Sequence, residues 1–145
     1  DEAYLIIRGI RTLDIRLKAH SENTLKIVNF LKKQKKIKEV LYPHKPGSKN
    51  YKMWKKYYSG ATGLFSIVIK AKSQSSVLKF VNKLELFGIG YSWGGFESLA
   101  IHHNISKSRT FYKFGKDEHL VRIHVGLEDP ADLILDLKNS LKFIK

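Results

Sequence analysis

Apolar residues in the first quarter of the chain recur at the spacing of one face of an α-helix. Between residues 11 and 36, the positions that fit this period are Leu13, Leu17, Thr24, Ile27, Val28 and Leu31. A shorter helix or turn is expected around residues 4–8, separated from the long helix by Gly9, because glycine weakens a helix interior. The pattern therefore predicts a helical segment over residues 1–35 that leads into the rest of the domain.

Four later segments have the composition or the alternation of β-strands: residues 37–42, 63–70, 89–101 and 120–127. Pro43 ends the first, and the third is long enough for one strand or a pair. Alternation in the last segment places Val121, Ile123, Val125 and Leu127 on one face and Leu120, Arg122, His124 and Gly126 on the other. Residues 102–119 show little periodicity and are expected to be irregular.

Two helices are predicted between these strands. Ser48 is expected to cap a short helix that carries Tyr51 and Trp54. Ser75 or Ser76 is expected to begin a second helix, which runs to Leu84.

A last helix is predicted after Asp129, which caps it, with Pro130 at its first position, where the missing N–H costs nothing. Its buried stripe is expected to consist of Ile134, Leu135, Leu141 and Ile144. The elements together predict an α/β domain of the α+β type, in which helices cover one face of a mostly antiparallel sheet.

Composition fits one globular domain. The 145 residues are 43% hydrophobic, and the absence of cysteine excludes disulfides, a thiolate nucleophile and cysteine-ligated metals. No apolar run approaches the ~20 residues that span a bilayer, and the first four residues do not resemble a signal peptide. A cytoplasmic protein without a membrane partner is therefore expected.

The net charge of +14 raises the question of nucleic-acid binding, because clustered cations gain affinity by releasing counterions from phosphates. Only five of the 27 basic residues are arginine, the residue best shaped for phosphates and base edges. The lysines are also dispersed, apart from runs at residues 32–36 and 52–56. The charge is interpreted as a solvated surface, and no nucleic-acid partner is expected.

Arg122 is the strongest candidate for a functional residue, because it lies in a strand between apolar neighbours. A buried cation is costly unless it is paired. Arg122 could therefore face a cleft and bind a carboxylate through two parallel N–H···O bonds, or it could form a structural ion pair with Glu97 or Asp117. The pattern alone does not decide between these interpretations.

The segment Tyr91-Ser92-Trp93-Gly94-Gly95 also has two interpretations. It could wall a small-molecule pocket, with the glycines exposing backbone N–H donors. It could instead form a tight turn beside a core tryptophan, which is the more common arrangement. His102, His103, His119 and His124 lack the spacing of a helix-borne metal pair, so no metal is expected, although His124 shares a strand face with Arg122.

Five motifs resemble, in their order along the chain, the cysteine/methionine-metabolism family of enzymes that use pyridoxal phosphate. They are Arg8-Gly9-Ile10-Arg11-Thr12-Leu13, Val40-Leu41-Tyr42-Pro43, Ser59-Gly60-Ala61-Thr62-Gly63-Leu64-Phe65-Ser66, Gly94-Gly95-Phe96-Glu97-Ser98-Leu99 and Val121-Arg122-Ile123-His124-Val125-Gly126-Leu127-Glu128-Asp129. Within the family, Pro46-Gly47-Ser48-Lys49 with Trp54-Lys55, and Tyr91-Ser92-Trp93, are similar to the bacterial cystathionine β-lyase branch. The synthase and γ-lyase branches usually carry leucine at the position of Trp93.

The resemblance implies a substrate-binding domain for the β-elimination of L-cystathionine to homocysteine, pyruvate and ammonia, a step of methionine biosynthesis. By this likeness Arg122 binds the substrate α-carboxylate, Ser92 and Trp93 help to position it, and Tyr91 lines the pocket. The fold implied is the small carboxy-terminal domain of fold-type I pyridoxal-phosphate enzymes.

No lysine lies in a recognisable cofactor-binding motif, so no catalytic residue is assigned to this chain. The resemblance implies that pyridoxal phosphate is bound by a preceding domain, that the whole enzyme is a homotetramer, and that residues 1–145 are one carboxy-terminal domain, inactive alone. Two alternatives stay open: another sulfur-amino-acid lyase or transferase of the same family, and a non-catalytic basic binding module.

Overall fold

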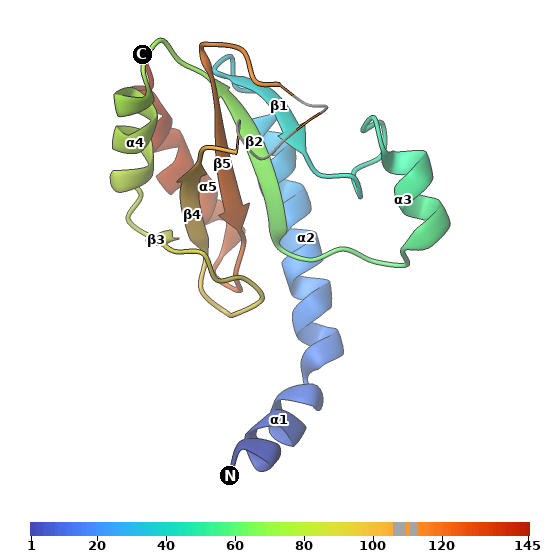
Figure 1. The fold of residues 1–145 in the computed structure, drawn as a ribbon. Coiled ribbons are helices and arrows are strands. Elements are labelled where there is room, and N and C mark those ends of the chain that lie inside the picture. Colours follow the sequence, from blue (N-terminus) through green and yellow to red (C-terminus); the bar gives the residue numbers. More distant parts are fainter. Residues whose placement is uncertain (106–109, 111–112) are drawn as a thin grey trace.

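A five-stranded sheet forms the centre of the molecule, in the strand order β1-β2-β5-β4-β3 (Figure 1). The computed structural model describes residues 1–105, 110 and 113–145. The strands are β1 (Ile37–Leu41), β2 (Leu64–Lys70), β3 (Gly88–Ile89), β4 (Leu99–His103) and β5 (Glu118–His124). All neighbouring strands are antiparallel except β3 and β4, which are parallel. The predicted α/β fold with a mostly antiparallel sheet is confirmed.

The alternation of side chains along β2 and β5 builds the core. The two strands pair in register, with Ile67 opposite Val121 and Phe65 opposite Ile123, and all four side chains are buried. They contact apolar residues of the helices in one continuous cluster. Because successive residues of a strand point to opposite faces, Arg122 lies on the face away from this cluster.

Helices cover one face of the sheet. Figure 1 shows α2 (Leu13–Leu31) and α5 (Pro130–Ser140) behind the strands, with α4 (Gln74–Asn82) beside β4. The short helix α3 (Tyr51–Tyr57) stands to one side, α1 (Glu2–Ile10) projects away from the body, and the 3-10 turn η2 (Leu141–Phe143) follows α5. No helix of the described residues is long and apolar enough to cross a membrane.

The helical segment at the start of the chain agrees with the sequence pattern, but the position of its break does not. Gly9 lies inside α1, and the chain turns at Arg11 and Thr12 instead. The Nη2 of Arg16 donates a 2.6 Å hydrogen bond to the Gly9 carbonyl, and the Thr12 N–H donates to the same oxygen. The turn thus uses a carbonyl that the end of α1 leaves free, which a propensity argument does not detect.

The caps of the two middle helices differ from the predictions. Asn50, not Ser48, precedes α3, and the Ser48 hydroxyl donates to the Pro43 carbonyl instead. Ser73, rather than Ser75 or Ser76, caps α4, by accepting a hydrogen bond from the Ser76 N–H. In a run of several serines, the extended backbone of one residue selects the cap, and composition does not reveal which one.

The predicted start of α5 is confirmed: Asp129 accepts a 2.7 Å hydrogen bond from the Ala131 N–H, and Pro130 is the first helical residue. Part of its predicted buried stripe is wrong. Leu135 is 55% exposed, and Leu133 and Leu137 are buried in its place, whereas Leu141 and Ile144 are buried as expected. The residues at 133, 137, 141 and 144 follow the three- and four-residue steps of a helix face, and Leu135 lies off that face.

The strand bounds shift by a few residues. The segment 89–101 contains two short strands, β3 and β4, of which β4 extends to His103. The last strand begins at Glu118 and ends at His124, so the region expected to be irregular is shorter than 102–119. Residues 106–109 and 111–112, including Arg109, lie outside the described residues.

A pair of leucines in α5 provides a matched test of this packing. Leu133→Ala removes a side chain with no exposed surface and should lower the free energy of unfolding by about 2–5 kcal/mol. Leu135→Ala, two residues along the same helix, should change it by less than about 0.5 kcal/mol. Urea unfolding followed by circular dichroism measures both, and equal losses would contradict the assigned helix face.

Candidate functional site

The segment 91–98 is attached to β5, and to the residues that follow it, at three successive points. Arg122 Nη2 donates a hydrogen bond to the Tyr91 carbonyl. The His124 ring contacts the backbone of Gly94 and Gly95. Gly126 N–H donates to the Ser98 hydroxyl oxygen at 2.9 Å. The side chains of Arg122 and His124 lie on the same face of β5, and the third contact comes from the backbone of the chain that follows the strand.

Glu128 completes the third attachment. Its carboxylate accepts from the Ser98 N–H at 2.7 Å and from the Ser98 hydroxyl at 2.8 Å. The Leu127 N–H donates to the Phe96 carbonyl at 2.8 Å. Ser98 is 1% exposed, so these bonds lie away from solvent, where the loss of one partner leaves the other unsatisfied.

Two glycines make this geometry possible. Gly94 has φ +84°, in the left-handed region that side chains with a Cβ rarely adopt. At Gly126, a Cβ would lie 2.1 Å from the Phe96 carbonyl oxygen and 2.4 Å from a Glu128 oxygen. The first glycine lets the segment turn, and the second lets it approach the end of β5.

Arg122 is half-buried and has no carboxylate partner among the described residues. The ion pair with Glu97 or Asp117 that was considered from the sequence is not formed. The guanidinium lies 5.7 Å from the centroid of the Tyr91 ring, which in turn packs edge-on against the His103 ring at 5.8 Å. Since a guanidinium carries five N–H donors and one is used by the Tyr91 carbonyl, donors remain for an anion.

The four side chains singled out from the sequence are not equally close. Tyr91 and Arg122 are in contact, whereas no hydrogen bond or cation–π interaction joins Ser92 or Trp93 to Arg122. Ser92 and Trp93 lie on the same segment, and Tyr91 and Trp93 are each 63% exposed. The chain bends at Gly94 and Gly95, with Gly94 in the left-handed region, but Trp93 is not a core residue, so that part of the alternative interpretation is wrong.

The supporting residues Ser98, Glu128 and His124 were not assigned these roles from the sequence. Ser98 and Glu128 stand 30 residues apart and meet only because β4 and β5 pair. Only a weak sequence signal pointed to these roles: Ser98 and Glu128 are polar residues near the ends of glycine-containing motifs. A serine and a glutamate in such positions are equally compatible with an exposed turn.

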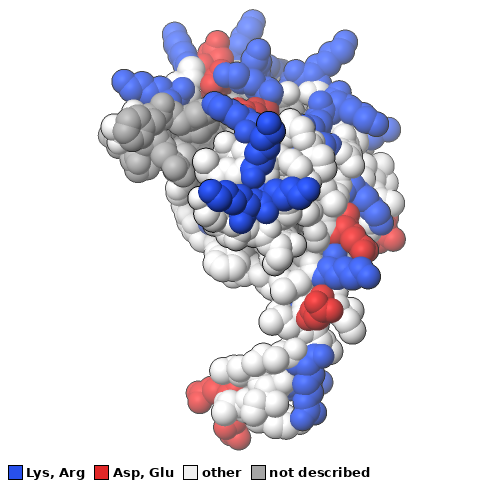
Figure 2. All heavy atoms as spheres, turned by 90° about the vertical axis from the view of Figure 1, so that its right-hand side faces the viewer, with Lys and Arg blue, Asp and Glu red and all other residues white. Residues whose placement is uncertain are grey.

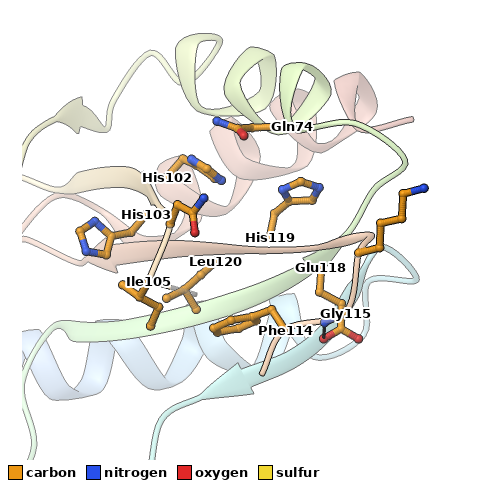
Figure 3. Close-up of a pocket in the computed structure, with 11 residues that line it drawn as sticks. Gln74, His102, His103, Ile105, Phe114, Gly115, Glu118, His119 and Leu120 are labelled. Carbon is orange, nitrogen blue, oxygen red and sulfur yellow. Dashed lines mark hydrogen bonds between the residues drawn. The ribbon is translucent and has the colours of Figure 1, made fainter. Parts of the chain in front are cut away.

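A separate pocket of about 310 Å³ lies at the opposite end of β4 and β5 (Figure 3). His102 and His119 point toward α4 near Gln74, with ring centroids 5.9 Å apart. Burial, and then the neighbouring His119, lower the pKa of His102. No group of three or more metal-ligating side chains occurs among the residues that the structure describes.

Lysine and arginine side chains gather on part of the molecular surface. Figure 2 shows Lys and Arg side chains spread over much of one face of the molecule, with a few Asp and Glu side chains among them. All lysines of the runs 32–36 and 52–56 are exposed. Burial, and then the charges of Lys32 and Lys33, lower the pKa of Lys45, which lies near them.

The structure thus defines an α/β domain with one helix-covered sheet face and, on the other, an arginine with free donors beside exposed aromatic rings. A family model described as Cys/Met metabolism PLP-dependent enzyme matches residues 1–142. The chain belongs to this family of pyridoxal-phosphate enzymes, as its five motifs indicated.

Relatives with different names share this domain. The chain is 40% identical over 141 residues to cystathionine beta-lyase MetC of Escherichia coli K12, covering 94% of this chain and 36% of the relative. It is 40% identical over 142 residues to an L-alanine/L-glutamate racemase of Wolbachia pipientis wMel, covering 97% of this chain and 35% of the relative.

A solved structure agrees with the fold. The crystal structure of a proposed O-acetylhomoserine (thiol)-lyase from Campylobacter jejuni superposes with a TM-score of 0.79 at 32% identity. The match covers 97% of this chain and 32% of that one, which contains N'-pyridoxyl-lysine-5'-monophosphate. The chain therefore spans about a third of the length of the proteins that it matches.

Because the Phe96 carbonyl lies close to Gly126, replacement by alanine should destabilise the protein at Gly126 but not at Gly60. Gly126→Ala places a methyl group against the Phe96 carbonyl and should lower the free energy of unfolding by about 1–3 kcal/mol. Gly60→Ala is the control, because no atom lies within 4 Å of its Cβ position, and it should be close to neutral. Chemical denaturation of both variants tests this, and a neutral Gly126→Ala would contradict the attachment of segment 91–98.

Proposed function

We propose that this chain is the carboxy-terminal, substrate-carboxylate-binding domain of a pyridoxal-phosphate-dependent cystathionine β-lyase. The reaction is the cleavage of L-cystathionine to homocysteine, pyruvate and ammonia. The observation that carries the proposal is Arg122: a half-buried guanidinium without a carboxylate partner among the described residues, held beside an exposed aromatic side chain. A planar guanidinium matches a carboxylate through two parallel hydrogen bonds.

The role of the domain is orientation. The Tyr91 carbonyl fixes one edge of the guanidinium, so its remaining N–H groups have a defined direction toward the substrate. Binding the α-carboxylate in one orientation aligns the Cα–H bond with the base that removes its proton. Correct positioning lowers a barrier by up to about 7–11 kcal/mol in ideal cases. Tyr91, Ser92 and Trp93 line the same side and contact the rest of the substrate.

The cofactor does not fit this chain as a covalent site. Of the lysines in the described residues, all are exposed except Lys45, and Lys45 donates a hydrogen bond to the Asn29 side chain. Pyridoxal phosphate, when bound, supplies the electron sink for loss of the α-proton. We infer that a preceding domain of the same polypeptide binds it, and that this chain contributes only substrate contacts.

The surface of α1 and of the first turns of α2 is consistent with such a partner domain. Its apolar side chains are 38–70% exposed: Tyr4, Leu5, Ile6, Ile7, Ile10, Leu13, Ile15 and Leu17. Many exposed apolar side chains on one helical segment are typical of an interface. We expect this surface to be covered in a whole enzyme that is a cytoplasmic homotetramer.

Because the relatives carry the names of different enzymes, the reaction that the whole protein catalyses has to be measured. A racemase and a lyase are equally similar to this chain, and both chemistries begin with loss of the α-proton of an amino acid. The full-length protein should therefore be assayed with L-cystathionine, L-alanine, L-glutamate and O-acetylhomoserine. Pyruvate release from cystathionine supports the proposal, and racemisation without pyruvate release would overturn it.

Arg122→Ala in the full-length protein should raise KM for cystathionine and lower kcat/KM by on the order of 100-fold, because a charge-assisted bidentate contact is lost. Arg122→Lys should recover only part of the loss, since an ammonium lacks the planar fork. The control is Lys138→Ala, which removes an exposed cation of α5. Unchanged kinetics in Arg122→Ala would contradict the assignment of the carboxylate site.

The isolated chain gives a second test. Mixed with pyridoxal phosphate and L-cystathionine, it should release no pyruvate, because no described lysine lies in an enclosed site. Co-expression with the remainder of the polypeptide should restore the release. Turnover by the 145-residue chain alone would show that the cofactor site had been placed in the wrong domain.

A further inference from the structure

The His124 ring is the middle attachment of segment 91–98 to β5. The Gly94 nitrogen lies 3.1 Å from Nε2 and 3.5 Å from Nδ1, and its N–H donates to the ring. Nε2 also lies 3.1 Å from the Gly95 carbonyl oxygen. His124 is 2% exposed, so water does not compete freely for these backbone groups.

The turn held by His124 is connected to the arginine through only two residues. Tyr91, whose carbonyl accepts from Arg122, is separated from Gly94 by Ser92 and Trp93. Both Arg122 and His124 extend from the same face of β5, two residues apart. A displacement of the Gly94–Gly95 turn therefore moves the Tyr91 carbonyl relative to the guanidinium.

We propose that His124 is a positioning residue for carboxylate recognition, which fixes the Gly94–Gly95 turn and, through it, the direction of the Arg122 guanidinium. The inference rests on the proposed function, since it concerns the same carboxylate site. It adds a residue that touches neither the substrate nor the cofactor.

The protonation state of the His124 ring decides how well the ring fixes the Gly94–Gly95 turn. A neutral imidazole carries one donor and one acceptor, and the ring nitrogen nearest to the Gly94 N–H is Nε2, at 3.1 Å. In the tautomer with the hydrogen on Nδ1, Nε2 accepts from the Gly94 N–H. The imidazolium has two donors and no acceptor, so the Gly94 N–H loses its partner, and only the Gly95 carbonyl can be bound. The neutral ring can therefore fix the Gly94 N–H, and the charged ring cannot.

The surroundings favour the neutral ring. Burial lowers the pKa of His124, and the charges of His20 on α2 and of Arg122 on β5 lower it further. The hydrogen bond to Gly95 and the Glu128 carboxylate act in the opposite direction. His20 packs 5.3 Å away, ring centroid to ring centroid, and its Nδ1–H donates to the Val125 carbonyl.

The direction of the pH effect follows from these shifts. The pKa of His124 is lower in the folded protein than in the unfolded chain, so the proton binds more tightly to the unfolded state. The contribution of the neutral ring to folding is complete above the ordinary histidine pKa of about 6.5 and is lost as the pH falls below it. Carboxylate binding should weaken only as the pH falls through the lower pKa of His124 in the folded protein.

A first experiment tests the contact without any enzymatic assay. In this chain labelled with ¹⁵N, NMR spectra recorded from about pH 4.5 to pH 8 report the His124 ring nitrogens and the Gly94 backbone amide. We expect the Gly94 amide to shift with the same midpoint as the His124 ring. The Gly94 shift should vanish in His124→Gln and persist in His119→Gln, which alters the far end of β5. A Gly94 amide that does not follow the His124 ring would overturn the proposal, whether or not the variants fold.

A second experiment uses the full-length enzyme. His124→Phe fills the ring volume without a polar contact and should raise KM for cystathionine on the order of tenfold, with kcat changed less than twofold. His124→Gln, which offers a donor and an acceptor, should restore most of the affinity and remove the dependence of KM on pH below 6.5. An unchanged KM in His124→Phe, in a protein whose Arg122→Ala variant loses affinity, would overturn the role of His124 and leave the proposed function standing.

Discussion

The attachment of segment 91–98 to the end of β5 is the constraint on which the candidate site depends. One face of β5 supplies a guanidinium and an imidazole, and the chain after the strand supplies the Gly126 N–H; they contact backbone groups and one hydroxyl of the segment. The segment has no regular secondary structure of its own at residues 91–98, so these bonds replace the ladder that would otherwise hold it. The side chains of Tyr91, Trp93 and Phe96 are consequently exposed to solvent while the backbone of the segment is fixed.

The difference between a central strand and an irregular segment explains why Arg122 lies in the sheet and the aromatic residues lie on segment 91–98. β5 is the central strand, bonded on both sides by β2 and β4, and its other face is packed against the core. A residue on such a strand has little freedom to move, which suits a group that must orient a charge. Trp93 and Phe96, by contrast, are exposed and make no hydrogen bond that holds the segment through their side chains, so these side chains can change.

Much of the fold could be predicted from the sequence, because it depends on local periodicity. The alternation along residues 120–127 identified the faces of β5, and the Asp129–Pro130 pair located the start of α5. The errors have a common cause. The cap of α4 and the break between α1 and α2 depend on which of several equivalent residues makes a local hydrogen bond, and the buried face of α5 depends on packing against distant elements. The pattern of residue types does not contain that information.

The same limit applied to the site. Arg122 and Tyr91 could be singled out because a charge among apolar residues and an aromatic residue near glycines are unusual in themselves. His124, Ser98 and Glu128 act through bonds across about 30 residues, and each is ordinary in its local context. Whether Arg122 pairs with Glu97 or Asp117 likewise depends on distances in three dimensions, which residue charge and sequence spacing do not give.

The exposure of Tyr91, Trp93 and Phe96, each between 63% and 70%, has a consequence for how this domain evolves. Mutations at Trp93 and Phe96 remove no buried side chain and no hydrogen bond that holds the segment, and mutations at Tyr91 remove only its ring contacts with Arg122 and His103, so the folding penalty should be small. Different substrate contacts at these positions are therefore compatible with one unchanged carboxylate contact at Arg122, the contact that we propose. A cystathionine beta-lyase and an L-alanine/L-glutamate racemase are each 40% identical to this chain over this domain.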